Sequence, residues 1–196
     1  VIIKIDDRDA RGIDLETAIS LMRGEVGSKV TLVLERREAE GTVQITRELV
    51  RREISVPTVE SKVLPGTSIG YIVISQFTAH TAEEMQQNLA KLQKEQVKGL
   101  ILDLRDNPGG ELLAAVNVAK NFVPQGPVVY IDYRFGRDQE FTSEGRTIQL
   151  PLIVLVNGSS ASAAEILAGA IKDTGAGTLV GTRTFGKGIV QTVFPL

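Results

Sequence analysis

Residues 99–122 read GLILDLRDNPGGELLAAVNVAKNF, and this stretch decides the fold class. Its first six residues are apolar except for Asp103 near their end and predict a buried strand, and residues 107–110 are a turn signal with one proline and two glycines. Residues 111–122 place apolar side chains at helical spacing and predict a helix. A strand that leads through a turn into a helix is half of a βαβ unit, so the stretch favours an α/β fold with a parallel sheet.

The same alternation of strand and helix patterns recurs through the rest of this part of the chain. The expected strands are residues 69–74, 128–133, 152–156, 179–180 and 189–194, and the expected helices are residues 81–96 and 159–172. Thr81 and Glu84 have the spacing of a capping box, and residues 135–149 predict a loop or hairpin. In parallel α/β sheets, catalytic groups lie beyond the carboxyl ends of the strands, so the candidates for a site are the turns that follow them.

A small α+β module is predicted in front of this core, over residues 1–54. A weak strand pattern opens it, and residues 15–23 carry apolar side chains on one helical face behind Asp14, a good N-cap. Two alternating segments on either side of Glu40 and Gly41 predict a hairpin.

The domain boundaries follow from these patterns. Residues 55–66 contain two prolines and are expected to be a linker, and residues 67–196 are expected to form the core. Because the chain opens inside a strand pattern and stops just after another one, both ends are expected to be cut. The core is then incomplete at its carboxyl-terminal end.

The composition excludes several kinds of chemistry. Lys and Arg number 22 and Asp and Glu number 24, a balance that argues against nucleic acid as the main partner. The chain has no cysteine and one histidine, His80, so thiol nucleophiles, disulfides and His-rich metal sites are excluded. An enzyme built from this chain would take a lysine or a carboxylate as its general base. No apolar run reaches the roughly 18 residues that a transmembrane helix needs.

Three serines follow the expected strand at residues 152–156, where a helix should start. Ser159 or Ser160 is the natural N-cap, and Ser162 is expected inside the first turn, where capping does not need it. Backbone N–H groups at a helix start are unpaired and can hold an oxyanion, so Ser162 is a candidate nucleophile. The alternative is that all three serines only cap the helix.

Two other turns carry candidate groups. Lys187 lies between two glycines, and a lysine acts as a general base only when it is neutral. Its pKa must then fall from about 10.4 to roughly 7–8, which demands a buried apolar pocket, and the alternative is a solvated lysine on a loop. Gly109 and Gly110 expose backbone N–H groups that could donate to an oxyanion, and the alternative there is an ordinary strand-to-helix turn.

Four short motifs occur in an order and spacing that resemble one known family. They are Gly70-Tyr71-Ile72, residues 98–110, residues 160–165 and residues 184–188, which Gln191 follows. Together they resemble the carboxyl-terminal processing, or tail-specific, proteases, which are S41-type Ser/Lys peptidases with a PDZ domain. Residues 1–53 are similar to the later part of that PDZ domain.

The resemblance implies a complete set of site residues. They are the nucleophile Ser162, its general base Lys187, the lysine-orienting Gln191, the oxyanion-hole donors Ala163 and Gly109 or Gly110, and the accessory carboxylate Glu165. No metal and no cofactor is implied. The core would adopt the α/β spiral fold of Clp proteases and crotonases.

The implied function is a serine endopeptidase that cleaves proteins near their carboxyl terminus, with PDZ-assisted recognition of the substrate's C-terminal segment. The implied location is the cell envelope, outside the cytoplasm. Binding of an adaptor, self-association, membrane association and the activity of this chain on its own stay open. Two alternatives also stay open, namely a non-catalytic PDZ-containing adaptor that binds peptides and an acyl-CoA enzyme of the crotonase type.

Overall fold

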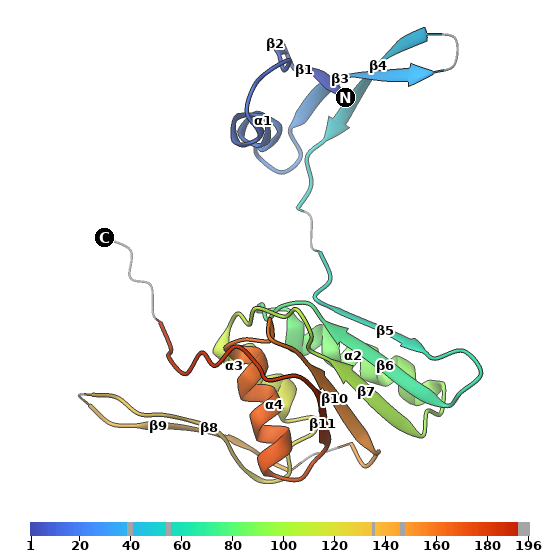
Figure 1. Cartoon of the computed structure of the whole chain (residues 1–196). Helices are drawn as coiled ribbons and strands as arrows, with labels where there is room; N and C mark the ends of the chain where they lie inside the picture. Colours follow the sequence, from blue (N-terminus) through green and yellow to red (C-terminus); the bar gives the residue numbers. More distant parts are fainter. Residues whose placement is uncertain (39–40, 54–55, 135, 146–147, 192–196) are drawn as a thin grey trace. The chain divides into compact units, whose positions relative to one another are not determined.

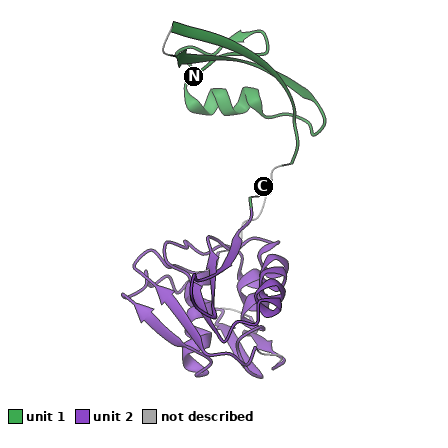
Figure 2. Ribbon diagram, turned by 90° about the vertical axis from the view of Figure 1, so that its right-hand side faces the viewer, with its two compact units in different colours: residues 1–56 green, residues 57–196 purple. Residues whose placement is uncertain are grey.

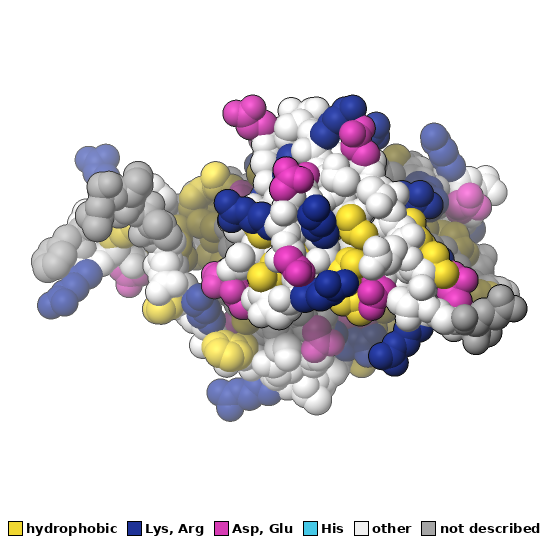
Figure 3. Space-filling view, turned by 90° about the horizontal axis from the view of Figure 1, so that it is seen from above, with side chains coloured by type: hydrophobic (Ala, Val, Ile, Leu, Met, Phe, Trp, Pro, Cys, Tyr) yellow, Lys and Arg dark blue, Asp and Glu magenta, His cyan; other side chains and the backbone are white. Residues whose placement is uncertain are grey.

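The computed structural model describes residues 1–38, 41–53, 56–134, 136–145 and 148–191. The chain divides into two compact units, Val1–Val56 and Pro57–Leu196, and each is described by itself (Figure 2). On the face shown in Figure 3, acidic and basic side chains are interspersed, in keeping with the near balance of the two charges. None of the described helices is both long enough and apolar enough to cross a membrane.

Unit 1 is a four-stranded antiparallel sheet with one helix. The strands are β1 (Ile2–Ile5), β2 (Arg8–Asp9), β3 (Lys29–Glu38) and β4 (Gly41–Val50), in the order β2-β1-β3-β4, and the helix is α1 (Leu15–Met22) (Figure 1). Asp14 caps α1 as expected, because its carboxylate accepts from the N–H of Thr17 at 2.9 Å. The expected hairpin is formed by β3 and β4, and Glu40 lies outside the described residues. The small core consists of Ile5, Val30 and Leu32, against which the inner face of α1 packs.

Arg51 holds the carboxyl-terminal end of α1, whose last carbonyl groups have no partner within the helix. Its guanidinium donates to the carbonyl oxygens of Met22 at 2.9 Å and Leu21 at 3.3 Å. It also donates to the Ser28 hydroxyl at 2.9 Å and to the Lys29 carbonyl oxygen at 2.7 Å. One side chain that follows β4 therefore ties the helix to the sheet in a unit with a small core.

Unit 2 is built on a five-stranded sheet. Its strands, in spatial order, are β11 (Thr178–Gly181), β10 (Leu152–Val156), β7 (Gly99–Asp103), β6 (Ile69–Ile74) and β5 (Val59–Val63). All neighbours are parallel except β5, which runs antiparallel to β6. The helices α2 (Thr81–Lys94), α3 (Leu112–Ala119) and α4 (Ala163–Asp173) lie between strands along the chain (Figure 1). The expected α/β fold with a mainly parallel sheet is therefore confirmed.

One core joins the three helices to one face of this sheet. Along β10, Leu152, Val154 and Val156 are buried, whereas Ile153 between them is 40% exposed. Strand β6 alternates in the same way. The buried side chains of the sheet and of all three helices belong to a single apolar cluster. This packing fixes the strand ends, and with them the loops that leave the sheet.

A second, two-stranded sheet belongs to the same unit. It consists of β8 (Gly126–Ile131) and β9 (Gln139–Ser143), which pair antiparallel as a hairpin that extends away from the main sheet (Figure 1). The segment 135–149, expected to be a loop or hairpin, contributes β9 to this hairpin, and its residues 135, 146 and 147 lie outside the described ones. The strand expected at residues 189–194 is absent from residues 189–191, and its remaining residues lie outside the described ones.

Residues 55–66 are not a plain linker, because Val59–Val63 form β5. The carboxylate of Glu84 in α2 holds the start of this strand. It accepts from the N–H and the hydroxyl of Thr58 at 2.7 and 2.8 Å and from the N–H of Val59 at 3.1 Å. Burial by itself raises the pKa of Glu84, but these hydrogen bonds outweigh it and hold the pKa below its ordinary value.

The prediction of a capping box at Thr81 and Glu84 is wrong, because the Glu84 carboxylate binds the start of β5. Glu84 turns outward to the neighbouring strand instead of back to the helix start. The N-cap residue is His80, whose side chain makes no capping hydrogen bond, and the Thr81 hydroxyl accepts from the N–H of Thr78 at 2.8 Å. A tertiary contact has replaced the local one.

Replacing Arg51 by alanine is expected to destabilise unit 1, because four acceptors lose their donor. A hydrogen bond contributes about 0.5–1.5 kcal/mol, so the free energy of unfolding of this unit should fall by about 2–3 kcal/mol. Hydrogen exchange at the amides of α1 measures the change. Arg52→Ala is the matched control, because Arg52 is an exposed neighbour. Equal protection of α1 in the two variants would contradict the role given to Arg51.

Candidate active site

A cleft of about 650 Å³ in unit 2 brings together residues that the sequence singled out. Strands β7 and β10 are parallel neighbours, so the loops that follow them leave the same edge of the sheet. We call residues 104–111, after β7, the glycine loop and residues 157–162, after β10, the serine loop. The expected site residues that line the cleft are Ser162, Ala163, Gly110, Lys187 and Gln191.

Ser162 has a backbone conformation that residues other than glycine rarely adopt. Its φ is 53° and its ψ is −116°, and it is the N-cap residue of α4. Such conformations cost about 1–3 kcal/mol and cluster at functional sites. The expectation that Ser162 lies inside the first helical turn is wrong, because the sharp turn of the serine loop delays the start of α4 to Ala163. The strained turn places Ser162 on the wall of the cleft.

Ser159 and Ser160 do not cap α4, contrary to expectation. Ser160 is fully buried, and its hydroxyl donates to the carbonyl oxygen of Leu104 at 2.7 Å and accepts from the N–H of Asn157 at 3.0 Å. The N–H of Ser159 donates to the side-chain oxygen of Asn157 at 3.1 Å. Both serines therefore belong to the internal structure of the serine loop, which leaves Ser162 as the serine that faces the cleft.

The two glycines of the glycine loop have different partners. The N–H of Gly109 donates to Oδ1 of Asn107 at 2.8 Å, and its carbonyl oxygen accepts from the N–H of Phe77 at 2.8 Å. The N–H groups of Gly110 and Ala163 make no hydrogen bond with any residue that the structure describes. Gly110, rather than Gly109, is therefore the glycine whose N–H is available to an oxyanion.

The glycine loop packs directly against the serine loop. A Cβ atom placed on Gly109 would lie 2.8 Å from the Cβ of Ser162 and 3.0 Å from the backbone nitrogen of Ala163. Only a residue without a side chain permits this approach, and its φ of +97° also favours glycine. The close contact places the available donors of the two loops on one cleft.

Glu165 connects the serine to the segment that carries the lysine. One carboxylate oxygen accepts from the N–H of Gly186 at 2.7 Å, and the other accepts from the N–H groups of Lys187 at 2.9 Å and Ser162 at 2.8 Å. Burial by itself raises the pKa of Glu165, but hydrogen bonds from the Thr184 side chain and from these N–H groups outweigh it. The pKa is therefore held below its ordinary value, and the carboxylate stays charged.

Lys187 is exposed, and this differs from the buried pocket that the sequence argument demanded. Gln191, which was expected to orient the lysine, is exposed as well. The apolar side chains next to the lysine share this exposure, with Phe185 69% exposed and Ile189 64% exposed. The structure thus brings Ser162 and Lys187 to one cleft without the desolvation that a neutral lysine requires.

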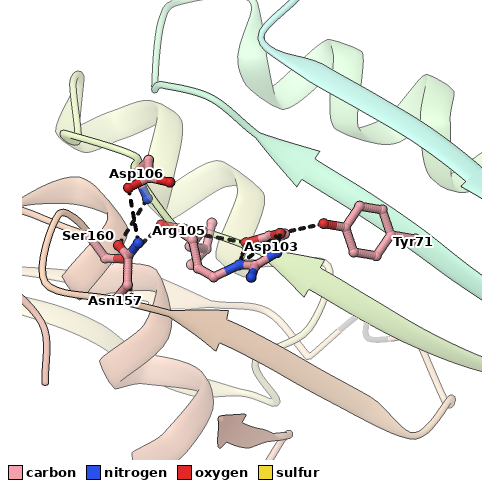
Figure 4. Close-up of polar contacts among 7 residues, drawn as sticks. Tyr71, Asp103, Arg105, Asp106, Asn157 and Ser160 are labelled. Atoms are coloured by element: carbon pink, nitrogen blue, oxygen red, sulfur yellow. Dashed lines mark hydrogen bonds and ion pairs between the residues drawn. The ribbon is translucent and has the colours of Figure 1, made fainter. Parts of the chain in front are cut away.

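A polar network that the sequence did not assign lies at the end of β7 (Figure 4). Asp103 is 4% exposed and accepts from the hydroxyl of Tyr71 and, at 2.6 Å, from the guanidinium of Arg105. Burial by itself raises the pKa of Asp103, but the hydrogen bonds from Arg105 and Tyr71 outweigh it and hold the pKa below its ordinary value. The signal in the sequence was the charged end of an otherwise apolar strand.

Asn107 is a second residue to which the sequence assigned no role. It is fully buried, its Nδ2 donates to the carbonyl oxygen of Ile74 at 2.8 Å, and its Oδ1 accepts from the N–H of Gly109. This side chain holds the turn of the glycine loop on the end of β6. Its position in an Asn-Pro-Gly-Gly sequence predicted only an ordinary turn residue.

Comparison with known proteins places this cleft in a family. The profile of Peptidase family S41 matches residues 68–196, a range that includes every residue of the cleft. The chain belongs to peptidase family S41. The resemblance to S41-type processing proteases that the motifs indicated is therefore confirmed.

Relatives of known name cover the whole chain. It is 41% identical over 199 residues to the carboxyl-terminal-processing protease of Synechocystis sp., and the match covers 100% of this chain and 46% of that protein. It is 38% identical over 209 residues to the chloroplastic C-terminal processing peptidase of Tetradesmus obliquus, covering 100% of this chain and 45% of that protein. The chain therefore spans about half the length of the curated relatives it matches.

A solved structure gives the same result for the fold. The photosystem II D1 C-terminal processing protease matches with a TM-score of 0.64 at 36% identity, over 100% of this chain and 54% of that chain. The mixed α/β fold of this family is therefore confirmed for this chain.

Replacing Gly110 by alanine is expected to displace the glycine loop. A Cβ atom there would lie 2.0 Å from the carbonyl oxygen of Phe77, and the φ of +135° adds strain. We expect the free energy of unfolding of unit 2 to fall by at least about 2 kcal/mol in urea titrations. Gly158→Ala is the matched control, because its nearest neighbour, the Arg183 carbonyl oxygen, would lie at 3.9 Å. A similar loss in both variants would contradict this account.

The contacts of Glu165 predict a pH dependence. Because its pKa lies below the ordinary value of 4.5, its stabilising contribution is present above 4.5 and is lost as the pH falls through the lower, folded value. We expect the amide proton shifts of Gly186 and Lys187 to titrate together in NMR spectra, with a midpoint below 4.5. The titration should vanish in Glu165→Gln and persist in Glu144→Gln. A midpoint at or above 4.5 would contradict the hydrogen bonds given to the Glu165 carboxylate.

Proposed function

We propose that this chain belongs to a serine endopeptidase that cleaves proteins near their carboxyl terminus with a Ser162/Lys187 dyad. The observation that carries the proposal is the strained Ser162 beside the N–H groups of Gly110 and Ala163, which have no partner in the part of the chain that the structure describes, in a cleft that Lys187 also lines. Membership of peptidase family S41 and the names of the relatives support the same reaction class.

In the proposed mechanism, neutral Lys187 takes the proton of the Ser162 hydroxyl as the serine oxygen attacks the scissile carbonyl carbon. The N–H groups of Gly110 and Ala163 donate to the oxyanion that forms. The lysine ammonium then gives its proton to the leaving amine, and an acyl-enzyme remains. Water, activated by the same lysine, attacks the ester, and the released serine recovers its proton.

Two further residues support the dyad in this proposal. Glu165 binds the backbone N–H groups of Ser162 and Lys187 and so holds the two segments together. Gln191 lines the same cleft as Lys187, four residues further along the chain, and would orient the amine by a hydrogen bond. Neither residue exchanges a proton with the substrate.

The exposure of Lys187 sets a condition on the mechanism. A charged ammonium cannot accept the serine proton, so the amine must be neutral when the serine attacks. Burying the exposed Phe185 and Ile189, which are close to Lys187 along the chain, would remove water from the amine and favour its neutral form. We propose that a polypeptide in the cleft, or other parts of the full-length protein, provides this cover.

Unit 1 would serve recognition. Its strands β1, β3 and β4 and its helix α1 fit the later part of a PDZ domain, as the sequence resemblance implied. Such a module would present the C-terminal segment of a protein substrate to the cleft. We further propose a location outside the cytoplasm, at the cell envelope or an equivalent compartment, as for a processing enzyme. Self-association and adaptor binding are compatible with this assignment.

One observation favours a second candidate function. The exposed Lys187 also suits a non-catalytic, PDZ-containing adaptor that binds peptides on the same fold. Such a protein would bind C-terminal peptides and would not react with a fluorophosphonate, which modifies only an activated serine. The two candidates therefore differ in a single labelling experiment.

Ser162→Ala and Lys187→Ala in the full-length protein are expected to abolish fluorophosphonate labelling and cleavage of an unfolded protein. The loss in kcat should be at least about 1000-fold, because removing the nucleophile of a serine protease costs about 10⁶-fold. Ser159→Ala, in the same loop as Ser162, and Lys172→Ala, at an exposed lysine of α4, are the matched controls, and both should keep activity. Cleavage at the normal rate by Ser162→Ala would refute the assignment. A wild-type protein that binds C-terminal peptides but does not react with the fluorophosphonate would favour the adaptor.

A further inference from the structure

The two proposed oxyanion donors belong to different loops. The N–H of Gly110 lies on the glycine loop, and the N–H of Ala163 follows the serine loop. An oxyanion hole works only when its donors lie about 2.7–3.1 Å from the position of the oxyanion. The distance between the two loops must therefore be fixed by contacts outside the cleft.

Asp106 and Asn157 make such a contact in both directions (Figure 4). The backbone N–H of Asp106 donates to Oδ1 of Asn157 at 3.0 Å, and Nδ2 of Asn157 donates to Oδ1 of Asp106 at 3.0 Å. Asp106 is exposed, Asn157 is half-buried, and neither lines the cleft. The pair therefore joins the loops without reaching the substrate.

Asn157 is also tied into the serine loop. Its Oδ1 accepts from the N–H of Ser159, and its backbone N–H donates to the hydroxyl of Ser160. The same hydroxyl donates to the carbonyl oxygen of Leu104, at the start of the glycine loop. A shift of Asn157 would move the whole turn that ends at Ser162.

The contact is transmitted to the glycine donor through Asn107. This residue directly follows Asp106, and its carbonyl oxygen accepts from the N–H of Ala161 at 3.0 Å. Its side chain accepts from the N–H of Gly109, which precedes the donor Gly110. The chain of contacts thus runs from the Asp106–Asn157 pair to both sides of the cleft.

We propose that Asn157, through its pair with Asp106, is a positioning residue that sets the spacing of the two oxyanion donors. This inference rests on the proposed function, because it needs a reaction that develops an oxyanion. A positioning role and a purely structural role predict different kinetics. Misplaced donors lower kcat and leave KM nearly unchanged, since ground-state binding of the substrate does not use them.

Asn157→Asp tests the pair with almost no change of shape. The new carboxylate can still accept from the N–H groups of Asp106 and Ser159, but it faces the Asp106 carboxylate where an N–H donor stood. We expect kcat for a C-terminal peptide substrate to fall by about 10- to 100-fold, less than the roughly 100- to 1000-fold loss of a whole donor. KM should stay within about threefold.

The exchanged pair is the decisive variant. In Asp106→Asn/Asn157→Asp, the backbone N–H of residue 106 can still donate to residue 157, and the new amide of residue 106 can donate to the new carboxylate of residue 157. Both hydrogen bonds are then restored, and only the side-chain one has its direction reversed. We expect kcat to return to within about threefold of wild type, as coupled sites do in double-mutant cycles. Asn tolerates the positive φ of 59° at position 106, so the exchange adds no backbone strain.

Asn121→Asp is the matched control for replacing an amide by a carboxylate. Asn121 is also half-buried, and its Nδ2 donates to the carbonyl oxygen of Val118 at 2.9 Å, remote from the cleft. This variant should lower the melting temperature and keep kcat. If Asn157→Asp does not fold, Asp106→Gly at the exposed position removes the same acceptor and should lower kcat at constant KM.

The outcomes separate this inference from the proposed function. A loss of melting temperature in Asn157→Asp with unchanged kcat, or no recovery in the exchanged pair, overturns the positioning role. Ser162→Ala tests the proposed function independently in the same assay. Loss of activity in Ser162→Ala with full kcat in Asn157→Asp would leave the function standing and remove this inference.

Discussion

The parallel pairing of β7 with β10 is the constraint on which the site depends. It brings the glycine loop and the serine loop to one edge of the sheet, although more than forty residues separate them along the chain. The helices that pack on the buried face of the sheet hold this pairing rigid. The N–H groups of Gly110 and Ala163, beside Ser162, have no partner among the described residues, whereas the N–H groups next to them along the chain are hydrogen-bonded. The sheet therefore brings together two loops whose N–H groups remain available to a bound ligand.

The charged carboxylate of Glu165 makes a second connection within the site, between Ser162 and Lys187. The Glu165 carboxylate accepts three backbone N–H groups from two segments, and a charged acceptor makes stronger hydrogen bonds than a neutral one. Glu165, in the first turn of α4, therefore also fixes the backbone at Gly186 and Lys187 by hydrogen bonds. The lysine backbone is fixed by this contact, whereas its amine remains in water. The contact thus fixes where the backbone of Lys187 lies, and it does not bury the side chain.

The sequence predicted those parts of the molecule that depend on local patterns. The strand-turn-helix at residues 99–122 and the Asp14 cap follow from periodicity and turn chemistry. That Ser162, Lys187 and Gly110 line one cleft agrees with what the family resemblance of the motifs implied. Prediction from the sequence failed where a distant group replaced a local partner. Glu84 bonds to β5 instead of its own helix start, which explains both the lost capping box and the unexpected strand. Asn107 and Asn157 look like turn residues until the paired loops are seen together.

All the groups of the site, from Phe77 to Gln191, belong to unit 2. Unit 1 has a separate core, held by Ile5, Val30, Leu32 and the guanidinium of Arg51. Each unit therefore buries its own apolar side chains. In evolutionary terms, the packing of one core can change while the packing of the other is conserved.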